Sequence, residues 1–156
     1  MGIDYDWLQE RIFHRLLTED EKTGLEGFVT IESFPTGCPL VIENEQGGAL
    51  YLLRRGEVDV VMQFNGETVR LSHAGEGAQL GDMTFLDEKA ASATLIARKD
   101  CVAYKITRQA FADLLASRQD VARDLLFNTL ANMAGTIRQM NFSHAATTQY
   151  IQGRRV

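Results

Sequence analysis

Cysteine is scarce in this chain, which holds only Cys38 and Cys101 among its 156 residues. Two cysteines are too few for a small fold built on disulfides, and their spacing does not match a metal-binding motif. We therefore expect both thiols to behave as small buried apolar groups rather than as redox centres.

Long apolar runs and a basic leader are also lacking. No stretch approaches the roughly 18 uninterrupted apolar residues that a membrane span requires. The first nine residues carry Asp4 and Asp6, where a signal peptide would need Lys or Arg ahead of an apolar run. These absences predict a cytoplasmic protein with no membrane span.

Positive charge is in the minority, with 16 Lys and Arg against 21 Asp and Glu, so the formal net charge is −5. A surface of this sign repels phosphate backbones. The sequence also ends at Val156, which leaves no room for a helix-turn-helix domain after the last predicted helix. We therefore expect no direct binding to nucleic acid.

The residue patterns of common catalytic sites are missing. The three histidines, His14, His73 and His144, lie far apart in the sequence and form no His-x-His pair. There is no Gly-x-Ser-x-Gly motif, and no Cys/His pair is arranged for covalent chemistry. We expect a protein that is not an enzyme and holds no metal. A cupin-type metal enzyme is the least favoured alternative, because it would gather two or three histidines inside a barrel.

Apolar residues make up 45% of the chain, enough to build the core of one domain. Residues 1–28 are predicted to form N-terminal helices. Thr18 and Glu21 have the spacing of a capping box, which marks the start of the second of these helices. The apolar face of the first helix contains Trp7, Leu8, Ile12, Phe13, Leu16 and Leu17.

Residues 29–107 change to short β-rich runs separated by turn residues. Asn65 and Gly66 both tolerate positive φ, which makes them a strong signal for a two-residue hairpin. Strands of this length without helical crossovers predict a sandwich, jelly roll or barrel of seven or eight strands. The expected strands are 29–34, 39–42, 50–54, 58–64, 68–72, 93–98 and 101–106.

Residues 108–151 return to a helical period, with Thr107 as the cap of a short helix and a longer helix from about Gln119. Five apolar residues of the long helix alternate in spacing between four and three, as in a coiled-coil seam. This stripe either packs on the chain's own barrel or pairs with the same helix of a second copy. We favour the homodimer, because one barrel offers little flat surface for so long a helix. The seam comprises Leu126, Leu130, Met133, Ile137 and Met140.

The segment 75–94 carries the most functional information. A strand ends near Gly75 and Gly77, and Gly81 with Asp82 then opens a single helical turn. Gly81 allows close approach of the backbone, and we expect the free N–H groups of Met83 and Thr84 to point at a ligand. The Asp82 carboxylate could accept hydrogen bonds from two hydroxyl groups, such as those of a ribose.

With these features the chain resembles the cyclic nucleotide-binding domain family, known from catabolite-activator-type regulators, kinase regulatory subunits and gated channels. The resemblance covers roughly residues 10–140, including the segment 47–58, the Gly75/Gly77 turn and the flanking helices. It implies a double-stranded β-helix, or jelly roll, with helices before it and a long helix after it. It also implies a role in signal transduction through binding of cyclic nucleotides such as cAMP.

The resemblance also identifies departures from the family's phosphate-binding cassette. That cassette carries a glutamate for the ribose and a Pro-Arg pair for the cyclic phosphate; here Asp82 and the pair Ala90-Ala91 stand at these positions. Ala91 has no donor to replace a guanidinium. We therefore expect a regulatory module in which cyclic-nucleotide binding is weak or lost, with no other cofactor and with a protein partner as a further candidate.

A working cAMP or cGMP sensor is the alternative interpretation. In that case Ser92 would supply one hydrogen bond, and Lys89 would act as a substitute cation for the missing arginine. The candidate ligand site comprises Gly81, Asp82, Met83, Thr84, Ala91, Ser92 and Ala93.

Overall fold

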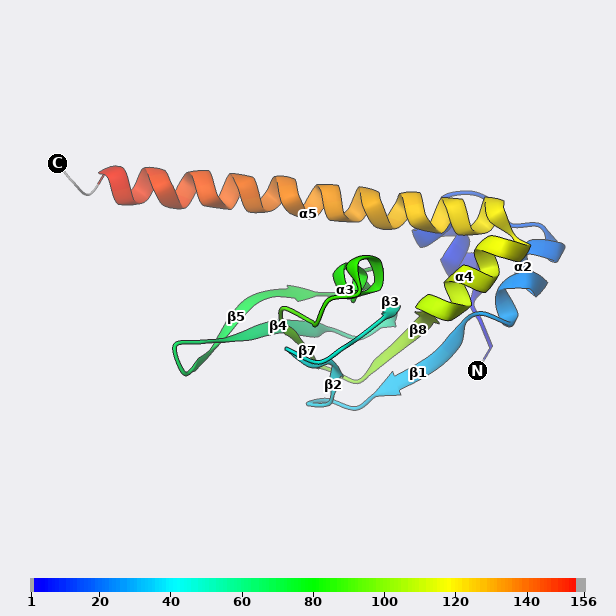
Figure 1. Cartoon of the computed structure of the whole chain (residues 1–156), viewed down its shortest axis with the longest axis horizontal. Coiled ribbons are helices and arrows are strands. Elements are labelled where there is room, and N and C mark those ends of the chain that lie inside the picture. Colours follow the sequence, from blue (N-terminus) through cyan, green and yellow to red (C-terminus); the bar gives the residue numbers. More distant parts are fainter. Residues whose placement is uncertain (1, 154–156) are drawn as a thin grey trace.

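Two four-stranded sheets form a roll in a computed structural model that describes residues 2–153, and the helices from the two ends of the chain lie together at one end of these sheets (Figure 1). Both sheets are antiparallel, with strand orders β1-β8-β3-β6 and β2-β7-β4-β5. This arrangement confirms the predicted jelly roll with flanking helices. The strands are β1 (Thr30–Phe34), β2 (Pro39–Val41), β3 (Ala49–Arg55), β4 (Val58–Phe64), β5 (Glu67–Ala74), β6 (Gln79–Leu80), β7 (Thr94–Ala97) and β8 (Cys101–Thr107).

The predicted hairpin joins β4 and β5 through Asn65 and Gly66, whose φ angles are 52° and 81°. Both loop residues therefore adopt the positive φ that a tight two-residue turn requires. The strand β6 was not predicted, because its two residues between Gly77 and Gly81 are too short to show a period. It is formed by pairing with β3, where Leu80 lies opposite Tyr51.

The core is divided into two apolar clusters by the sheet that contains β3. Leu50 and Leu52 point toward the helices, whereas Tyr51 and Leu53 point between the two sheets. This division follows from the alternation of side chains along a strand. Because β3 is almost fully buried on both sides, it connects the helical part of the core with the interior of the roll.

The N-terminal helices are α1 (Tyr5–Leu8), the π-helix η1 (Gln9–Phe13) and α2 (Glu19–Glu26). The capping box of α2 is confirmed, with the Thr18 side chain accepting from the Glu21 N–H and the Glu21 side chain accepting from the Thr18 N–H. The expectation that Leu16 is part of an apolar face is wrong, since its side chain is 82% exposed. His14 adopts a left-handed conformation that ends η1 and turns Leu16 to solvent.

The two cysteines differ in their surroundings. Cys101 is buried as expected, but Cys38 is exposed, so the prediction of two buried thiols is wrong for Cys38. Its N–H donates to the Pro35 carbonyl, which places it in the turn that precedes β2 rather than in the roll. This position on a surface turn explains the exposure.

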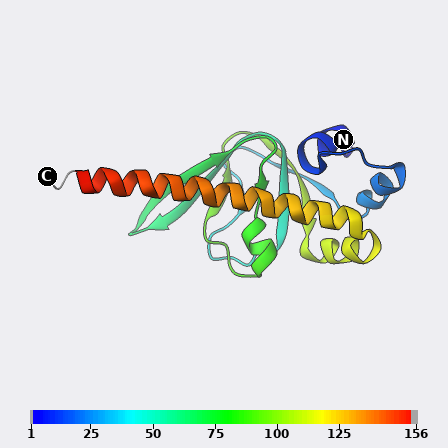
Figure 2. The ribbon, with the colours of Figure 1, turned by 90° about the horizontal axis from the view of Figure 1, so that it is seen from above.

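The helix α3 (Asp82–Asp87) is inserted within the roll between β6 and β7, and the roll is followed by α4 (Arg108–Ser117) and α5 (Gln119–Gly153). Thr107 caps α4 as predicted, because its side chain accepts from the Ala110 N–H. Figures 1 and 2 show that α5 passes over α3 and extends along the β4–β5 hairpin. No helix in the described part of the chain is long and apolar enough to cross a membrane.

The predicted seam on α5 is not covered by the chain's own roll. Leu130, Ile137 and Met140 are 45%, 55% and 64% exposed, and Leu126 and Met133 are half-buried. The residues that α5 buries against the rest of the chain are Val121, Ala122, Leu125 and Thr129. The interpretation in which the stripe packs on its own barrel is therefore wrong, because a different face of α5, confined to its first three turns, makes that contact.

Candidate functional site

The candidate cassette begins where β6 ends. Gly81 has a φ of 74°, and a Cβ atom added there would lie 2.6 Å from the Ala49 carbonyl oxygen. A side chain at this position would therefore force β6 away from β3. The close approach expected at Gly81 occurs, but the backbone that it approaches belongs to β3.

The Asp82 carboxylate stands at the start of α3 and accepts a hydrogen bond of 3.0 Å from the Met83 N–H. The expectation that this N–H is free for a ligand is therefore wrong. Burial raises the pKa of Asp82, because a carboxylate loses hydration in a partly apolar site. Among residues 2–153, no ion pair involves Asp82.

Thr84 is buried in the first turn of α3, with 6% of its surface exposed. Its hydroxyl donates to the Gly81 carbonyl oxygen at 3.1 Å. Met83 points in another direction, since it is 55% exposed. The structure thus gives the two neighbouring residues of the predicted site different roles, one in the packing of α3 and one at the surface.

The second half of the cassette is docked on the segment that follows β2. The Ala91 N–H donates to the Glu45 carbonyl at 3.0 Å, and the Ala91 carbonyl accepts from the Asn44 N–H at 2.8 Å. Ala91 is only 4% exposed, while Ser92 is exposed and Ala93 is half-buried. This backbone pairing fixes the position that the resemblance assigns to an arginine.

Lys89, the candidate substitute cation, is exposed. Its backbone N–H donates to the Asp87 carboxylate at 3.0 Å, and its ammonium group forms no ion pair within the described part of the chain. Its role toward a ligand therefore stays a prediction.

Arg108, the first residue of α4, is a site residue that the sequence analysis missed. Its guanidinium donates to the carbonyl oxygens of Phe85 and Leu86 and lies 3.1 Å from the Glu88 carboxylate. Phe85 also contacts Phe111 of α4 edge to face, with ring centroids 5.3 Å apart. The helix dipole disfavours a cation in the first turn of a helix. The position of Arg108 at the start of α4 was therefore a sequence signal that its side chain has a partner on another element.

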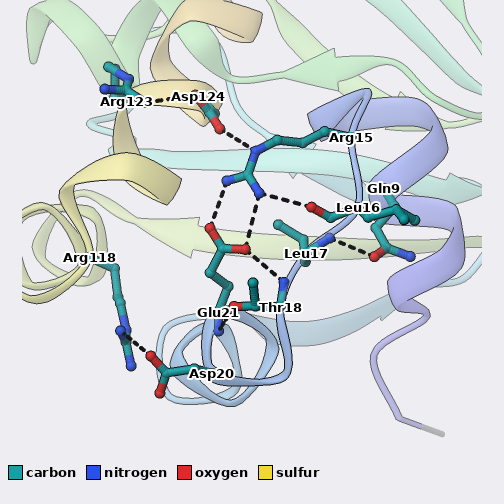
Figure 3. A network of polar contacts seen from close by, with 10 residues as sticks. All are labelled: Gln9, Arg15, Leu16, Leu17, Thr18, Asp20, Glu21, Arg118, Arg123 and Asp124. Carbon is teal, nitrogen blue, oxygen red and sulfur yellow. Dashed lines mark hydrogen bonds and ion pairs between the residues drawn. The ribbon is translucent and has the colours of Figure 1, made fainter.

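A polar network connects the N-terminal helices to the first turns of α5 (Figure 3). Arg15 forms two hydrogen bonds with Glu21 of α2 and one of 2.7 Å with Asp124 of α5. The hydrogen bonds from Arg15 lower the pKa of Glu21 to about 2. Arg118, at the end of α4, pairs with Asp20 of α2 in the same way. The helices before and after the roll are therefore held together as one layer.

Asn128 connects this layer to the cassette. Its side chain accepts from the Gln79 amide of β6 and donates to the Ile12 carbonyl of η1. Gln79 lies two residues before Gly81, while Arg108 contacts the other end of α3. Side-chain hydrogen bonds thus link the C-terminal helices to the strand that precedes α3 and to the end of α3.

Potential metal ligands are not gathered anywhere in residues 2–153: no group of three or more His, Cys, Asp or Glu side chains is close enough to hold an ion. The cupin-type alternative therefore gains no support from the structure.

Three known proteins are similar to this chain in sequence. The chain is 30% identical over 115 residues to the cyclic AMP receptor protein of Thermus thermophilus, covering 73% of this chain and 53% of the receptor. It is 31% identical over 90 residues to a cAMP-dependent protein kinase regulatory subunit of Aspergillus niger, covering 58% of this chain and 21% of the subunit. A cGMP-dependent protein kinase of Toxoplasma gondii is 29% identical over 109 residues, with coverage of 70% and 11%. The chain thus spans between 11% and 53% of the length of these three relatives.

Solved structures share the fold. A cyclic nucleotide-binding domain from Methylobacillus flagellatus superposes with a TM-score of 0.79 at 24% identity, covering 86% of this chain and 79% of that one. The regulatory subunit of a cAMP-independent protein kinase A from Trypanosoma brucei gives 0.67 at 23% identity, covering 92% and 49%. A variant of that subunit with three substitutions, one of which introduces an arginine, has been solved with cAMP bound.

The family model named "Cyclic nucleotide-binding domain" matches residues 31–118, which contain the roll except for Thr30, the first residue of β1, together with the cassette and α4. Since this match covers more than half of the sequence, the chain belongs to the cyclic nucleotide-binding domain family.

Proposed function

We propose that this chain is a non-enzymatic regulatory module of its family in which cyclic-nucleotide binding at the cassette is weak or lost. The observation that carries the proposal is Ala91, a buried residue with both backbone polar groups paired at the position of the family arginine. A methyl group there offers a cyclic phosphate neither charge nor a hydrogen bond.

The expected loss can be estimated from the contact that is absent. A charge-assisted hydrogen bond contributes about 1.5–3 kcal/mol, so its loss weakens binding roughly tenfold to a hundredfold. The Asp82 carboxylate has the same charge as the family's glutamate, so it does not compensate for the missing cation. It is also one methylene shorter than glutamate, which changes its reach to a ribose.

The Trypanosoma neighbour supports the same reasoning. That kinase is cAMP-independent, and the variant of its regulatory subunit solved with cAMP carries an introduced arginine. We infer that a cation in the cassette would restore binding in this chain, and that Ala91→Arg is the substitution that supplies it.

Isothermal titration of the wild-type chain and of Ala91→Arg with cAMP and cGMP tests this proposal. We expect wild-type binding weaker than micromolar and an increase of at least tenfold in Ala91→Arg. Ala90→Arg is the matched control, because this substitution adds the same charge one residue away, at an exposed position. Micromolar or tighter binding by the wild type would overturn the proposal.

A working cyclic-nucleotide sensor is the second candidate, favoured by the family match itself. In this case Lys89 and Ser92 would contact the phosphate, and both are exposed and therefore able to move toward it. Lys89→Gln and Ser92→Ala would then each weaken binding in the wild-type background. Under the first proposal neither substitution has a measurable effect.

We further propose that the chain forms a homodimer through the seam on α5. The alternation of four and three residues along Leu126, Leu130, Met133, Ile137 and Met140 is that of two paired helices. Of the seam side chains beyond Thr129, Leu130, Ile137 and Met140 are exposed in the single chain and Met133 is half-buried. Helical propensity alone gives a solvated helix little stability, so pairing with a second α5 supplies what the single chain lacks. A cytoplasmic location and the absence of direct nucleic-acid binding stay predictions.

A further inference from the structure

A cavity of about 580 Å³ lies at the end of the roll where α3 and α4 meet the two sheets. Its walls come from β2, the segment 45–48, β3, α3, the end of β8 and the start of α4. Of the residues predicted to bind a ligand in the cassette, only Thr84 lines it. The cavity is therefore a separate space, and its volume is typical of a site for a small organic molecule.

One wall of this cavity carries two cations. The Lys105 ammonium lies 2.8 Å from the Glu32 carboxylate and 5.8 Å from the centroid of the Tyr51 ring. Arg108 lines the same cavity and pairs with Glu88, whose side chain is 67% exposed. An ion pair with one partner so exposed is weak and exchanges readily with other anions.

Two buried polar side chains and an apolar strand complete the walls. Tyr51 and Thr84 both line the cavity and are only 7% and 6% exposed. The apolar part of the lining comes from β2 and the residue after it, where Leu40, Val41 and Ile42 supply aliphatic surface. The lining thus combines an apolar part with a polar part, in which Lys105, Arg108 and two hydroxyl groups lie with the carboxylates of Glu45 and Glu88. An organic anion with a compact apolar body suits this lining if it displaces a carboxylate from a cation.

We propose that this cavity binds a small organic anion of this kind, with Arg108 and Lys105 as the groups that hold its charge. The anion takes the place of Glu88 on Arg108, and its apolar body lies against β2. The proposal does not rest on whether the cassette binds a cyclic nucleotide, so it goes beyond the function proposed above.

Binding of an anion in the cavity would change the contacts between α3 and α4. Arg108 also donates to the carbonyl oxygens of Phe85 and Leu86 at the end of α3. An anion that draws the guanidinium toward itself competes with these hydrogen bonds. Because Arg108 is the first residue of α4, binding is linked to the contact between the cassette helix and the C-terminal helices.

Phenyl phosphate is a suitable probe, because it joins a phosphate to an aromatic ring. We would titrate it into the ¹⁵N-labelled full chain at constant ionic strength and follow the amide resonances by NMR. We expect saturable shifts at Gly47, Gly48, Lys105 and Arg108. Inorganic phosphate and phenol, each carrying one half of the probe, should bind at least about tenfold more weakly.

Variants with opposite expected signs make the test specific. Arg108→Gln and Lys105→Gln should each weaken binding of phenyl phosphate about tenfold or more, since each removes a charge-assisted contact. Glu88→Gln should tighten it severalfold by removing the competing carboxylate. Arg98→Gln is the matched control, because Arg98 is an exposed arginine outside the cavity that pairs with Glu57. It should leave the affinity unchanged.

Three results would overturn the proposal: no saturable shift at these four residues, unchanged affinity in both Arg108→Gln and Lys105→Gln, or shifts centred on Gly81–Met83 and Ser92. The amide spectrum of each variant also reports whether the chain is folded. Because the cassette proposal is tested with cAMP, cGMP and Ala91→Arg, either proposal can fail while the other stands.

Discussion

The long helix α5 contains two regions that differ in burial although the helix is continuous from Gln119 to Gly153. Up to Thr129, the side chains that α5 buries against the rest of the chain are at most 1% exposed, namely those of Val121, Ala122, Leu125 and Thr129. Beyond Thr129, the large apolar side chains include Ile137, Met140 and Phe142 at 55%, 64% and 78% exposure. The first region is part of the domain core, whereas the second depends on its own helical hydrogen bonds and on whatever covers its seam.

Truncation of a core side chain in the first region should have the largest effect on stability. Leu125 is 1% exposed, so Leu125→Ala is expected to lower the free energy of unfolding by about 2–5 kcal/mol. Phe127, two residues away and 66% exposed, is the matched control, and Phe127→Ala should change it by less than about 0.5 kcal/mol. Urea unfolding followed by circular dichroism measures both. Equal effects would show that the two sides of this region do not differ as described.

A charged residue in the seam should weaken dimerisation and leave the stability of the roll unchanged, which distinguishes the second region of α5 from the first. Leu130→Glu would place two unpaired carboxylates in the proposed dimer interface, which costs about 3 kcal/mol of association free energy, or a hundredfold in the dissociation constant. The roll should keep its stability, since Leu130 is 45% exposed in the single chain.

Light scattering of the wild type and of Leu130→Glu measures the oligomeric state. Ala131→Glu is the control, because Ala131 is exposed and lies one residue, about 100°, further round the helix from the seam. We expect the wild type and Ala131→Glu to be dimers and Leu130→Glu to be a monomer. A dimer that persists in Leu130→Glu would move the interface to another surface.

Features that depend on neighbouring residues could be predicted from the sequence, whereas features that depend on contacts between distant segments could not. Local signals were sufficient for the capping box at Thr18 and the hairpin at Asn65-Gly66, since each depends on residues within a few positions of one another. The seam on α5 rests on a local pattern too, and its pairing stays a prediction. The strand β6 depends on pairing with β3, and the π-helix η1 shows no separate period. Neither has a local signal.

The candidate site shows the same limit. The order of Gly81, Asp82 and Ala91 in the sequence was enough to predict a cassette. It could not show that the Met83 N–H is held by Asp82 or that Ala91 pairs with the segment after β2. Arg108 and the cavity that it lines are built from segments far apart in the sequence, so only the folded chain brings them together.

The smallest effect is expected from the network that anchors the first region of α5. The pKa of Glu21 is lowered from 4.5 to about 2 by Arg15, so folding favours its charged form. The stability that this pair contributes is therefore complete above about pH 4.5 and is lost as the pH falls toward 2. Because Arg15 is 35% exposed, we expect a contribution of only about 1–2 kcal/mol.

Urea unfolding of the wild type and of Glu21→Gln at pH 7 and pH 3 measures this contribution. At pH 7 the variant should be less stable than the wild type by the full amount, and at pH 3 the difference should shrink, because the unfolded wild type takes up a proton that the variant cannot. Asp113→Gln is the control, since Asp113 accepts from Gln109 within α4 and lies outside the network. A difference between Glu21→Gln and the wild type that stays constant across this pH range would mean that α5 is anchored by the packing of Leu125 and its neighbours, with no contribution from the charge on Glu21.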